Sequence, residues 1–213
     1  MRRYLAILGA ALLTATACGS QAPQGTQQTG APGATQAAQQ PVRGGRIVEG
    51  SISDIKTLQP VISTDTASSG VWGWVYVGLV RNNPDTGDLE GTLAEKFSTS
   101  ADGKVLTFNL RPNLVWSDGQ PFTGEDYKYT VEAVARSKKT VRKSQVQDIA
   151  GFKDYETGKT DSMSGIAVKD GGRTIEITFD KVQCVAARNV SGAGAGGILP
   201  KHHFAAAWDN KTT

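Results

Sequence analysis

Residues 116–126 read WSDGQPFTGED and carry the clearest folding signals in the chain. The Ser-Asp-Gly triplet at 117–119 favours a tight turn, and Pro121 restricts the backbone that follows it. Thr123 and Asp126 have the spacing of a capping box, which predicts that a helix begins at this point. Apolar side chains then recur on one face of that helix, at Tyr127, Val131, Val134 and Ala135. The stretch therefore predicts a turn that leads into a helix packed on a core.

Strand signals occur on both sides of this helix. Residues 46–51 have the composition of a first strand, and the triplet at 101–103 predicts the turn of a hairpin. After this triplet and after the Asp-Gly-Gly turn at 170–172, apolar residues alternate with others: Leu106, Phe108 and Leu110, then Ile175, Ile177 and Phe179. A helical stripe also runs through residues 71–80. Its candidate N-caps are Thr64, Thr66 and Ser68. Because strands and helices mix irregularly, without a repeated βαβ unit, the predicted fold class is α/β of the mixed α+β kind.

Residues 1–17 have the layout of an export signal rather than of a folded domain. Arg2 and Arg3 precede a short apolar run, and small residues then lead to Cys18. The apolar run is too short to span a membrane. With a cysteine at the cleavage point, the segment resembles a bacterial lipoprotein signal, in which Cys18 becomes the lipidated N-terminus. The other interpretation is an ordinary signal peptide with an unrelated cysteine.

Residues 18–44 are predicted to be a lipid-anchored, disordered linker. From position 19 to 41 they consist only of Gly, Ser, Gln, Ala, Pro and Thr. Such a composition cannot bury enough apolar surface to offset the conformational entropy lost on folding. The folded part is therefore predicted at 45–213, where Cys184 is left without an intramolecular partner.

The overall composition excludes several function classes. The chain has 213 residues, with 23 Lys+Arg against 20 Asp+Glu and a net charge of +3. So small a net charge argues against a nucleic-acid partner, since such domains are strongly basic. Two cysteines exclude a disulfide-dense scaffold and a multi-cysteine zinc module. The basic run at 136–143 is interpreted as a solvated helix end, with contact to anionic headgroups as the alternative.

The motifs that resemble catalytic or cofactor sites lack the neighbouring residues and elements that such sites require. The glycine-rich residues 192–197 are followed by Pro200 and do not open a helix, so no dinucleotide site is predicted. His202 and His203 are adjacent, and adjacent side chains diverge on a helix or strand. With no carboxylate beside them in the sequence, they are interpreted as a partly exposed pair rather than as metal ligands. The sequence thus predicts no catalytic residue, no metal and no cofactor, and hence a protein that is not an enzyme.

Six groups of residues follow one another in a recognisable order. They are TLQP at 57–60 with STDTAS at 63–68, GLVR at 78–81 with PDTG at 84–87, LAE at 93–95, ADG at 101–103 before TFNLR at 107–111, the stretch at 116–126, and ILPKHHF at 198–204. In this order the chain resembles the N-terminal part of the family 5 extracellular solute-binding proteins. These are the oligopeptide-, dipeptide- and nickel-binding lipoproteins of ABC importers.

The resemblance implies the first lobe of a two-lobed clamshell like that of periplasmic binding proteins, with the ligand held between the lobes. It implies that the ligand is a peptide or another small solute and that an ABC transporter permease is a partner. It also implies export to the periplasmic or extracellular face of the cell membrane, where a lipid holds the protein. Ligand contacts are expected from Ser63, Thr64, Asp65, Thr66 and Ser68. The alternative is that these residues only cap the helix that follows them.

Members of this family are more than twice as long as the chain. The second lobe is therefore expected to be missing, and the sequence to be a fragment or a truncated reading frame. One rival function is a lipid-anchored, exported interaction or structural protein without a transport role. Another is an exported hydrolase, which only generic Ser, Asp and His residues support.

Overall fold

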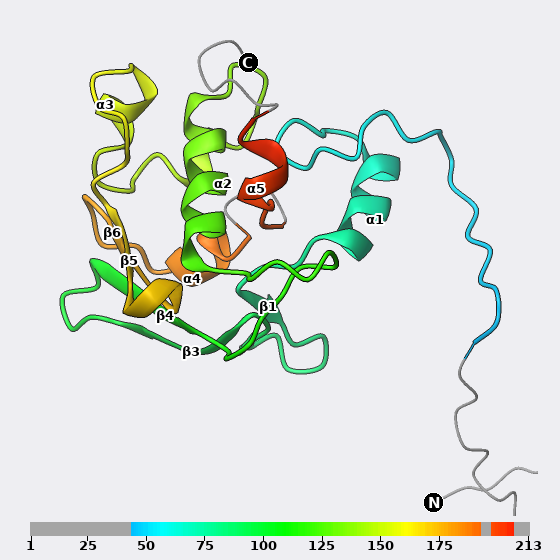
Figure 1. Ribbon diagram of the computed structural model, residues 1–213, viewed down its shortest axis with the longest axis horizontal. Helices are drawn as coiled ribbons and strands as arrows, with labels where there is room; N and C mark the ends of the chain where they lie inside the picture. The colour runs from blue at the N-terminus through cyan, green and yellow to red at the C-terminus, as the bar shows by residue number, and fades with distance from the viewer. Residues whose placement is uncertain (1–43, 193–196, 207–213) are drawn as a thin grey trace, which may run out of the picture. The chain divides into compact units, whose positions relative to one another are not determined.

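The computed structural model describes residues 44–192 and 197–206 of the chain (Figure 1). The export signal predicted at 1–17, Cys18 and all of the linker predicted at 18–44 except its last residue lie outside the described residues. The fold is therefore argued from the later part of the chain.

The chain divides into two units, Met1–Val48 and Glu49–Thr213. In the first unit, residues 44–48 are exposed and have no regular secondary structure. The strand predicted at 46–51 is wrong, because every residue there is exposed and none of them pairs with a described strand. A β-branched run forms a strand only where a neighbouring backbone supplies hydrogen-bond partners.

An antiparallel four-stranded sheet organises the second unit (Figure 1). The strands lie in the order β3 (Ala94–Thr99), β4 (Val105–Leu110), β6 (Thr174–Thr178) and β5 (Ile166–Lys169). The hairpin predicted around 101–103 is confirmed, since this turn joins β3 to β4. The Asp-Gly-Gly turn is confirmed as well: it forms the short 3-10 helix η2 (Asp170–Gly172) between β5 and β6.

The two central strands supply the middle of the core. Phe108 pairs with Ile175 and Leu106 with Ile177, and none of the four side chains is more than 1% exposed. Each such side chain contributes about 1.5–3 kcal/mol when it is fully buried. The alternation read from the sequence therefore identifies the buried face of this sheet.

Helix α2 (Gly124–Arg136) covers that face and begins as the capping box predicts. The Asp126 carboxylate accepts a hydrogen bond from the backbone N–H of Thr123 at 3.0 Å, while the Thr123 side chain accepts one from the first turn of the helix. A Cβ added to Gly124 would lie 2.9 Å from the Ile175 side chain. Glycine at this position thus lets the start of α2 approach the sheet closely.

Helix α1 (Thr66–Val75) has the length of the stripe at 71–80 but begins and ends five residues earlier. Val80 instead begins strand β1. The helical spacing of apolar residues after Val75 therefore does not reflect a helix. The candidate N-caps Thr64, Thr66 and Ser68 are wrong, because Asp65 caps α1.

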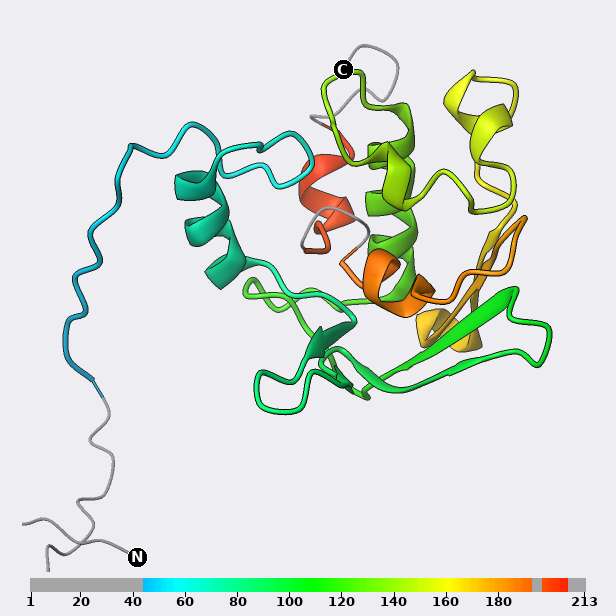
Figure 2. The ribbon, with the colours of Figure 1, turned by 180° about the vertical axis from the view of Figure 1, so that it is seen from behind.

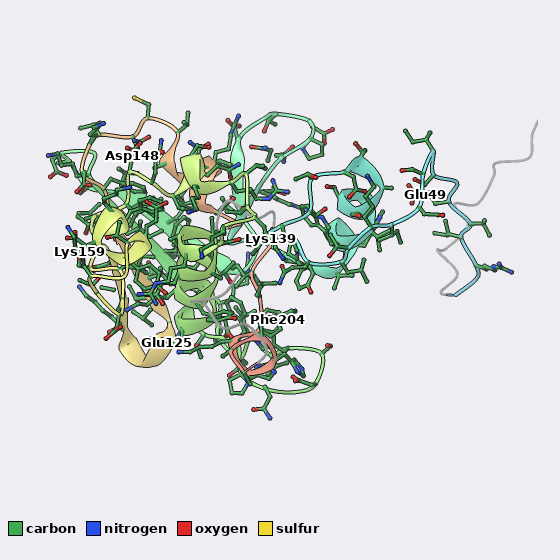
Figure 3. All side chains as sticks on the ribbon, turned by 90° about the horizontal axis from the view of Figure 1, so that it is seen from above. Glu49, Glu125, Lys139, Asp148, Lys159 and Phe204 are labelled. Carbon is green, nitrogen blue, oxygen red and sulfur yellow. The ribbon has the colours of Figure 1, made fainter. Side chains whose placement is uncertain are left out.

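Six shorter elements complete the described fold. They are β1 (Val80–Asn82), β2 (Leu89–Gly91), η1 (Lys143–Gln145), α3 (Phe152–Glu156), α4 (Ala186–Val190) and α5 (Lys201–Phe204). Figure 2 shows α4 beside the first turns of α2. Figure 3 labels Glu125 at the start of α2 and Phe204 at the end of α5; the two helices are linked by Lys201 of α5, which pairs with Glu125 at 3.2 Å. None of the helices within the described ranges is long and apolar enough to cross a membrane.

Candidate functional site

A hollow of about 470 Å³ opens where the chain leaving α1 meets the end of α4. Its walls come from segments far apart in the sequence: the residues after α1, the loop between β2 and β3, and the end of α4. The lining includes Tyr76, Gly78, Arg81, Thr92, Arg188 and Ser191. The hollow is therefore a product of the tertiary fold, and no single sequence motif encodes it.

Two backbone segments meet directly at the edge of this hollow. The N–H of Leu79 donates to the carbonyl of Ser191 at 2.7 Å. A Cβ added to Gly78 would lie 3.1 Å from the same carbonyl oxygen, closer than side chains normally approach a backbone atom. The hydroxyl of Thr92 donates to the carbonyl of Gly78. Glycine at position 78 therefore lets the two segments form one continuous wall.

A buried tyrosine holds the end of α4 in place. The hydroxyl of Tyr127 donates to the carbonyl of Val190 at 2.9 Å, one residue before Ser191. Tyr127 is fully buried, and burial raises its pKa far above the ordinary value, because a phenolate would lose its hydration there. The phenol therefore stays protonated and keeps its role as a donor.

Two arginines give the hollow its charge. The guanidinium of Arg81 pairs with Glu90, and Arg188 donates to the carbonyl of Gly87 at 3.2 Å. Within the described part of the chain, Arg188 has no carboxylate within ion-pair distance. Guanidinium groups bind carboxylates through paired N–H donors, so the hollow suits an anionic group.

The lining of the hollow consists of neutral polar groups and two arginines beside small and apolar residues. Among the described residues that line the hollow there is no Asp, Glu, His or Cys, so no general base stands beside the hydroxyls of Thr92 and Ser191. The Ser191 hydroxyl instead donates to the carbonyl of Arg188 at 3.2 Å. A hydroxyl without a base nearby is a weak nucleophile. The arrangement therefore offers hydrogen bonds and positive charge, without an activated nucleophile.

Comparison with known families settles what kind of protein carries this hollow. The family model of bacterial extracellular solute-binding proteins, family 5 (middle), matches residues 88–212, which is more than half of the chain. The chain belongs to this family. Its members are defined by solute binding, which agrees with a hollow that offers donors and charge.

Individual relatives of this family 5 protein are considerably longer. The chain is 36% identical over 114 residues to the oligopeptide-binding protein OppA of Bacillus subtilis, a match that covers 53% of this chain and 21% of the relative. It is 30% identical over 173 residues to a probable ABC transporter-binding protein of Deinococcus radiodurans, covering 79% of this chain and 26% of that one. The chain thus spans about a fifth to a quarter of the length of these curated relatives.

A solved structure confirms the fold. The crystal structure of a periplasmic oligopeptide-binding protein, OppAIV of Borrelia burgdorferi, superposes with a TM-score of 0.63 at 28% identity. The superposition covers 72% of this chain and 31% of that one. The family 5 protein therefore has the mixed α/β architecture predicted from its sequence, and the described residues correspond to part of one lobe.

Two of the predicted ligand residues serve the local backbone in this family 5 protein. Asp65 accepts a hydrogen bond from the N–H of Ser68 at 2.8 Å, and this bond holds the pKa of Asp65 below its ordinary value. The buried hydroxyl of Ser68 accepts hydrogen bonds from the N–H groups of Lys56 and Thr57 at 2.9 and 3.2 Å. The expectation that these residues cap the helix is confirmed for Asp65.

The other three predicted residues differ in exposure. Thr64 and Thr66 are exposed, whereas Ser63 is buried. Arg142 holds this segment by donating to the carbonyls of Pro60 at 3.1 Å and Ser63 at 2.7 Å. None of the five predicted ligand residues belongs to the lining of the 470 Å³ hollow.

Few sequence signals point to the residues that do line the hollow. Arg188 lies in a five-residue helix without a periodic apolar pattern. Ser191 and Gly192, at the start of the glycine-rich run, do reach the hollow, while positions 193–196 lie outside the described residues. At the end of the run the backbone is closely packed, because a Cβ added to Gly197 would lie 2.2 Å from the Cβ of Tyr76.

The diagnostic stretch at 116–126 proves to be scaffold. One oxygen of Asp126 accepts from the backbone N–H of Lys201 at 2.8 Å, and the other accepts from the indole of Trp116 at 3.4 Å. The rings of Trp116 and Phe122 pack with their centroids 5.3 Å apart. These contacts fasten the turn to α2 and α5, which explains why the stretch identifies the fold without contributing to the hollow.

Proposed function

We propose that this chain is part of the substrate-binding component of an ABC importer, and that it captures peptides or similar small solutes outside the cytoplasm. Membership of the solute-binding family is the observation that carries the proposal. Relatives named as oligopeptide-binding proteins favour a peptide over other solutes. The lining of the hollow, with hydrogen-bond donors and without a catalytic pair, agrees with a binding role.

The hollow is proposed as one wall of the ligand site. Arg188, which has no carboxylate partner among the described residues, offers its guanidinium to a ligand carboxylate. The backbone around Gly78 and Ser191 offers polar groups to a peptide main chain. Main-chain hydrogen bonds recognise a peptide whatever its side chains, so this wall would supply affinity with little sequence preference.

Ser63, Thr64, Asp65, Thr66 and Ser68 are proposed as a second contact region. Because Asp65 and Ser68 are engaged by the backbone around α1 and Ser63 is buried, the exposed hydroxyls of Thr64 and Thr66 are the groups that a ligand would meet. Asp65 then contributes by capping the helix on which these hydroxyls are held.

A second lobe is proposed to close over this wall in the whole protein. The described residues form part of one lobe, and the chain spans 31% of the superposed solute-binding protein. A ligand held from one side only keeps much of its surface in water. Peptide affinity of the 213-residue chain alone is therefore expected in the millimolar range.

Export and membrane attachment complete the proposal. Cys18 is proposed as the lipidated N-terminus, with residues 19–41 as a tether long enough to hold the folded part clear of the headgroups. An ABC permease is the proposed partner that receives the solute. The alternative, an exported interaction protein without a transport role, shares the anchor but has no need of a solute.

Nuclear magnetic resonance at millimolar peptide tests the binding role. Tri- to pentapeptides with free carboxyl ends should shift the amide signals of Gly78 and Ser191, and C-terminally amidated peptides should shift them less. Arg188→Gln should remove this difference, whereas Lys181→Gln, at an exposed cation outside the lining, should preserve it. Peptides that move no amide around the hollow would favour the interaction protein instead.

Metabolic labelling with palmitate in a bacterial host tests the anchor. The parent chain should incorporate label and sediment with membranes, and Cys18→Ser should do neither. Cys184→Ser is the matched control and should behave like the parent. A parent chain that is processed and secreted without label would support the ordinary signal peptide.

A further inference from the structure

Three side chains of types that bind metal ions converge where helix α5 meets the turn at 117–119: Asp118, His202 and His203. The imidazole Nε2 of His202 lies 2.8 Å from Oδ2 of Asp118, and Nε2 of His203 lies 3.0 Å from the same oxygen. All three donor atoms lie within 4.8 Å of one another. The sequence interpretation treated the histidines as lacking a carboxylate, and folding supplies one from 84 residues away.

The carboxylate is oriented before any ion arrives. Oδ1 of Asp118 accepts a hydrogen bond from the N–H of Gln120 at 3.0 Å, which leaves Oδ2 for the imidazoles. The turn itself is closed by the N–H of Gly119, which donates to the carbonyl of Trp116 at 2.9 Å. Asp118 is thus held by a tight turn rather than by a mobile loop.

The histidines are held on the same framework. The Asp126 carboxylate accepts from the backbone N–H of Lys201, directly before the pair, and from the indole of Trp116, two residues before Asp118. The Trp116 ring also contacts the His202 ring edge to face, with the centroids 6.5 Å apart. One buried carboxylate therefore fixes both the segment that carries the histidines and the segment that carries Asp118.

The spacing of the donor atoms suits a small divalent ion. Zinc binds imidazole nitrogen and carboxylate oxygen at about 2.0–2.2 Å, so two donors in a tetrahedral shell are about 3.3–3.5 Å apart. The 2.8 and 3.0 Å separations around Asp118 need to widen by only a few tenths of an ångström. Two exposed imidazole side chains can make such an adjustment by small rotations.

We propose that Asp118, His202 and His203 form a binding site for a divalent transition-metal ion of the zinc class. Two imidazoles and one carboxylate match the donor preference of zinc and its neighbours, and not that of magnesium or calcium, which take oxygen ligands. Three protein ligands leave one coordination position for water or for a donor atom of a solute. Because the three side chains are exposed, the affinity is expected in the micromolar range. This site is separate from the proposed peptide wall, and the inference does not depend on peptide binding.

Calorimetric titration with zinc chloride tests the site. The protein should be the exported chain from position 18, without an affinity tag and with Cys18→Ser and Cys184→Ser, so that these two histidines are its only imidazoles and no thiol competes. One zinc ion should bind per chain, and cobalt should give the visible absorption bands of a low-symmetry site. His203→Leu and Asp118→Asn should each weaken binding by about tenfold or more.

Two controls separate metal binding from a structural role. Asp161→Asn removes an exposed carboxylate elsewhere and should bind zinc like the parent. Circular dichroism and urea midpoints should show that His203→Leu leaves the fold intact, since His203 is largely exposed. The proposal is overturned if the parent shows no saturable binding, or if His203→Leu and Asp118→Asn bind zinc as tightly as the parent.

Discussion

Two tyrosines on helix α2 allow one substitution to be made in opposite environments. The hydroxyl of Tyr127 is buried and donates to the carbonyl of Val190, whereas the hydroxyl of Tyr129 is buried and has no hydrogen-bond partner among the described residues. Tyrosine to phenylalanine removes the same oxygen at both sites and keeps the ring. The difference between the two variants therefore isolates the hydrogen bond that holds the end of α4.

The two substitutions should change stability by different amounts. Tyr127→Phe leaves the buried Val190 carbonyl without a hydrogen-bond donor among the described residues, which costs about 1–3 kcal/mol. Tyr129→Phe removes an oxygen that is already unpaired, so it should be neutral or slightly stabilising. For a chain of this size, each kcal/mol lowers Tm by about 2–4 °C. Urea unfolding followed by tryptophan fluorescence gives the free energies, and scanning calorimetry gives Tm.

The two tyrosine variants also test whether Tyr127 fixes the wall of the hollow. Tyr127→Phe removes the hydrogen bond that holds Val190, which directly precedes Ser191 and Gly192 of the lining. The amide signals of Ser191 and Gly192 should therefore broaden in Tyr127→Phe and not in Tyr129→Phe. Equal losses of stability in the two variants, or an unchanged Tyr127→Phe, would refute the assignment of Tyr127 as the residue that fixes this wall.

Three further predictions concern stability. Asp65→Ala should cost about 0.5–2 kcal/mol in urea unfolding, because α1 loses its N-cap, and Asp65→Asn should recover most of the loss. Gly124→Ala should cost about 1–3 kcal/mol by the same assay, because the new Cβ would meet Ile175 at 2.9 Å; an unchanged midpoint would show that the contact relaxes freely. Burial raises the pKa of Tyr129 and of Tyr155 to about 12, while tyrosines of the unfolded chain ionise near the ordinary value of about 10. The unfolded state therefore releases protons first, so the urea midpoint should fall as pH rises above about 10, and late-titrating phenols should be visible at that pH by ultraviolet absorption.

Local signals in the sequence predicted local structure well. The capping box at Thr123 and the turns at 101–103 and 170–172 depend on residues within a few positions of one another, and all three are present. Sequence patterns predicted the structure wrongly where a segment needs a distant part of the chain to pair with. The run at 46–51 has the composition of a strand but finds no backbone to pair with among the described residues.

Contacts between side chains and distant parts of the chain are not visible in the sequence for the same reason. Arg142 belongs to a basic run interpreted as a solvated helix end, yet it donates to carbonyls about 80 positions earlier, and burial lowers its pKa. The Ser68 hydroxyl accepts hydrogen bonds from the N–H groups of Lys56 and Thr57, more than ten positions earlier, which the spacing of residues 63–68 does not indicate. Composition and spacing cannot show which distant atoms a polar side chain will meet.

The residues that identify the family and those that face the hollow are largely different. Residues 116–126 are fixed by contacts with α2 and α5, so a substitution there threatens the fold before it affects a ligand. Arg188 lies outside every motif that carries the resemblance, and its side chain is exposed at the hollow. A change at Arg188 would alter the charge offered to a solute without disturbing the core. Gly78 and Arg81 belong to a motif that carries the resemblance and also line the hollow, whereas Arg188 lines it from outside every such motif. If the proposed peptide wall is right, Arg188 is therefore the lining cation at which a substitution should change the solute preference with the least effect on the fold.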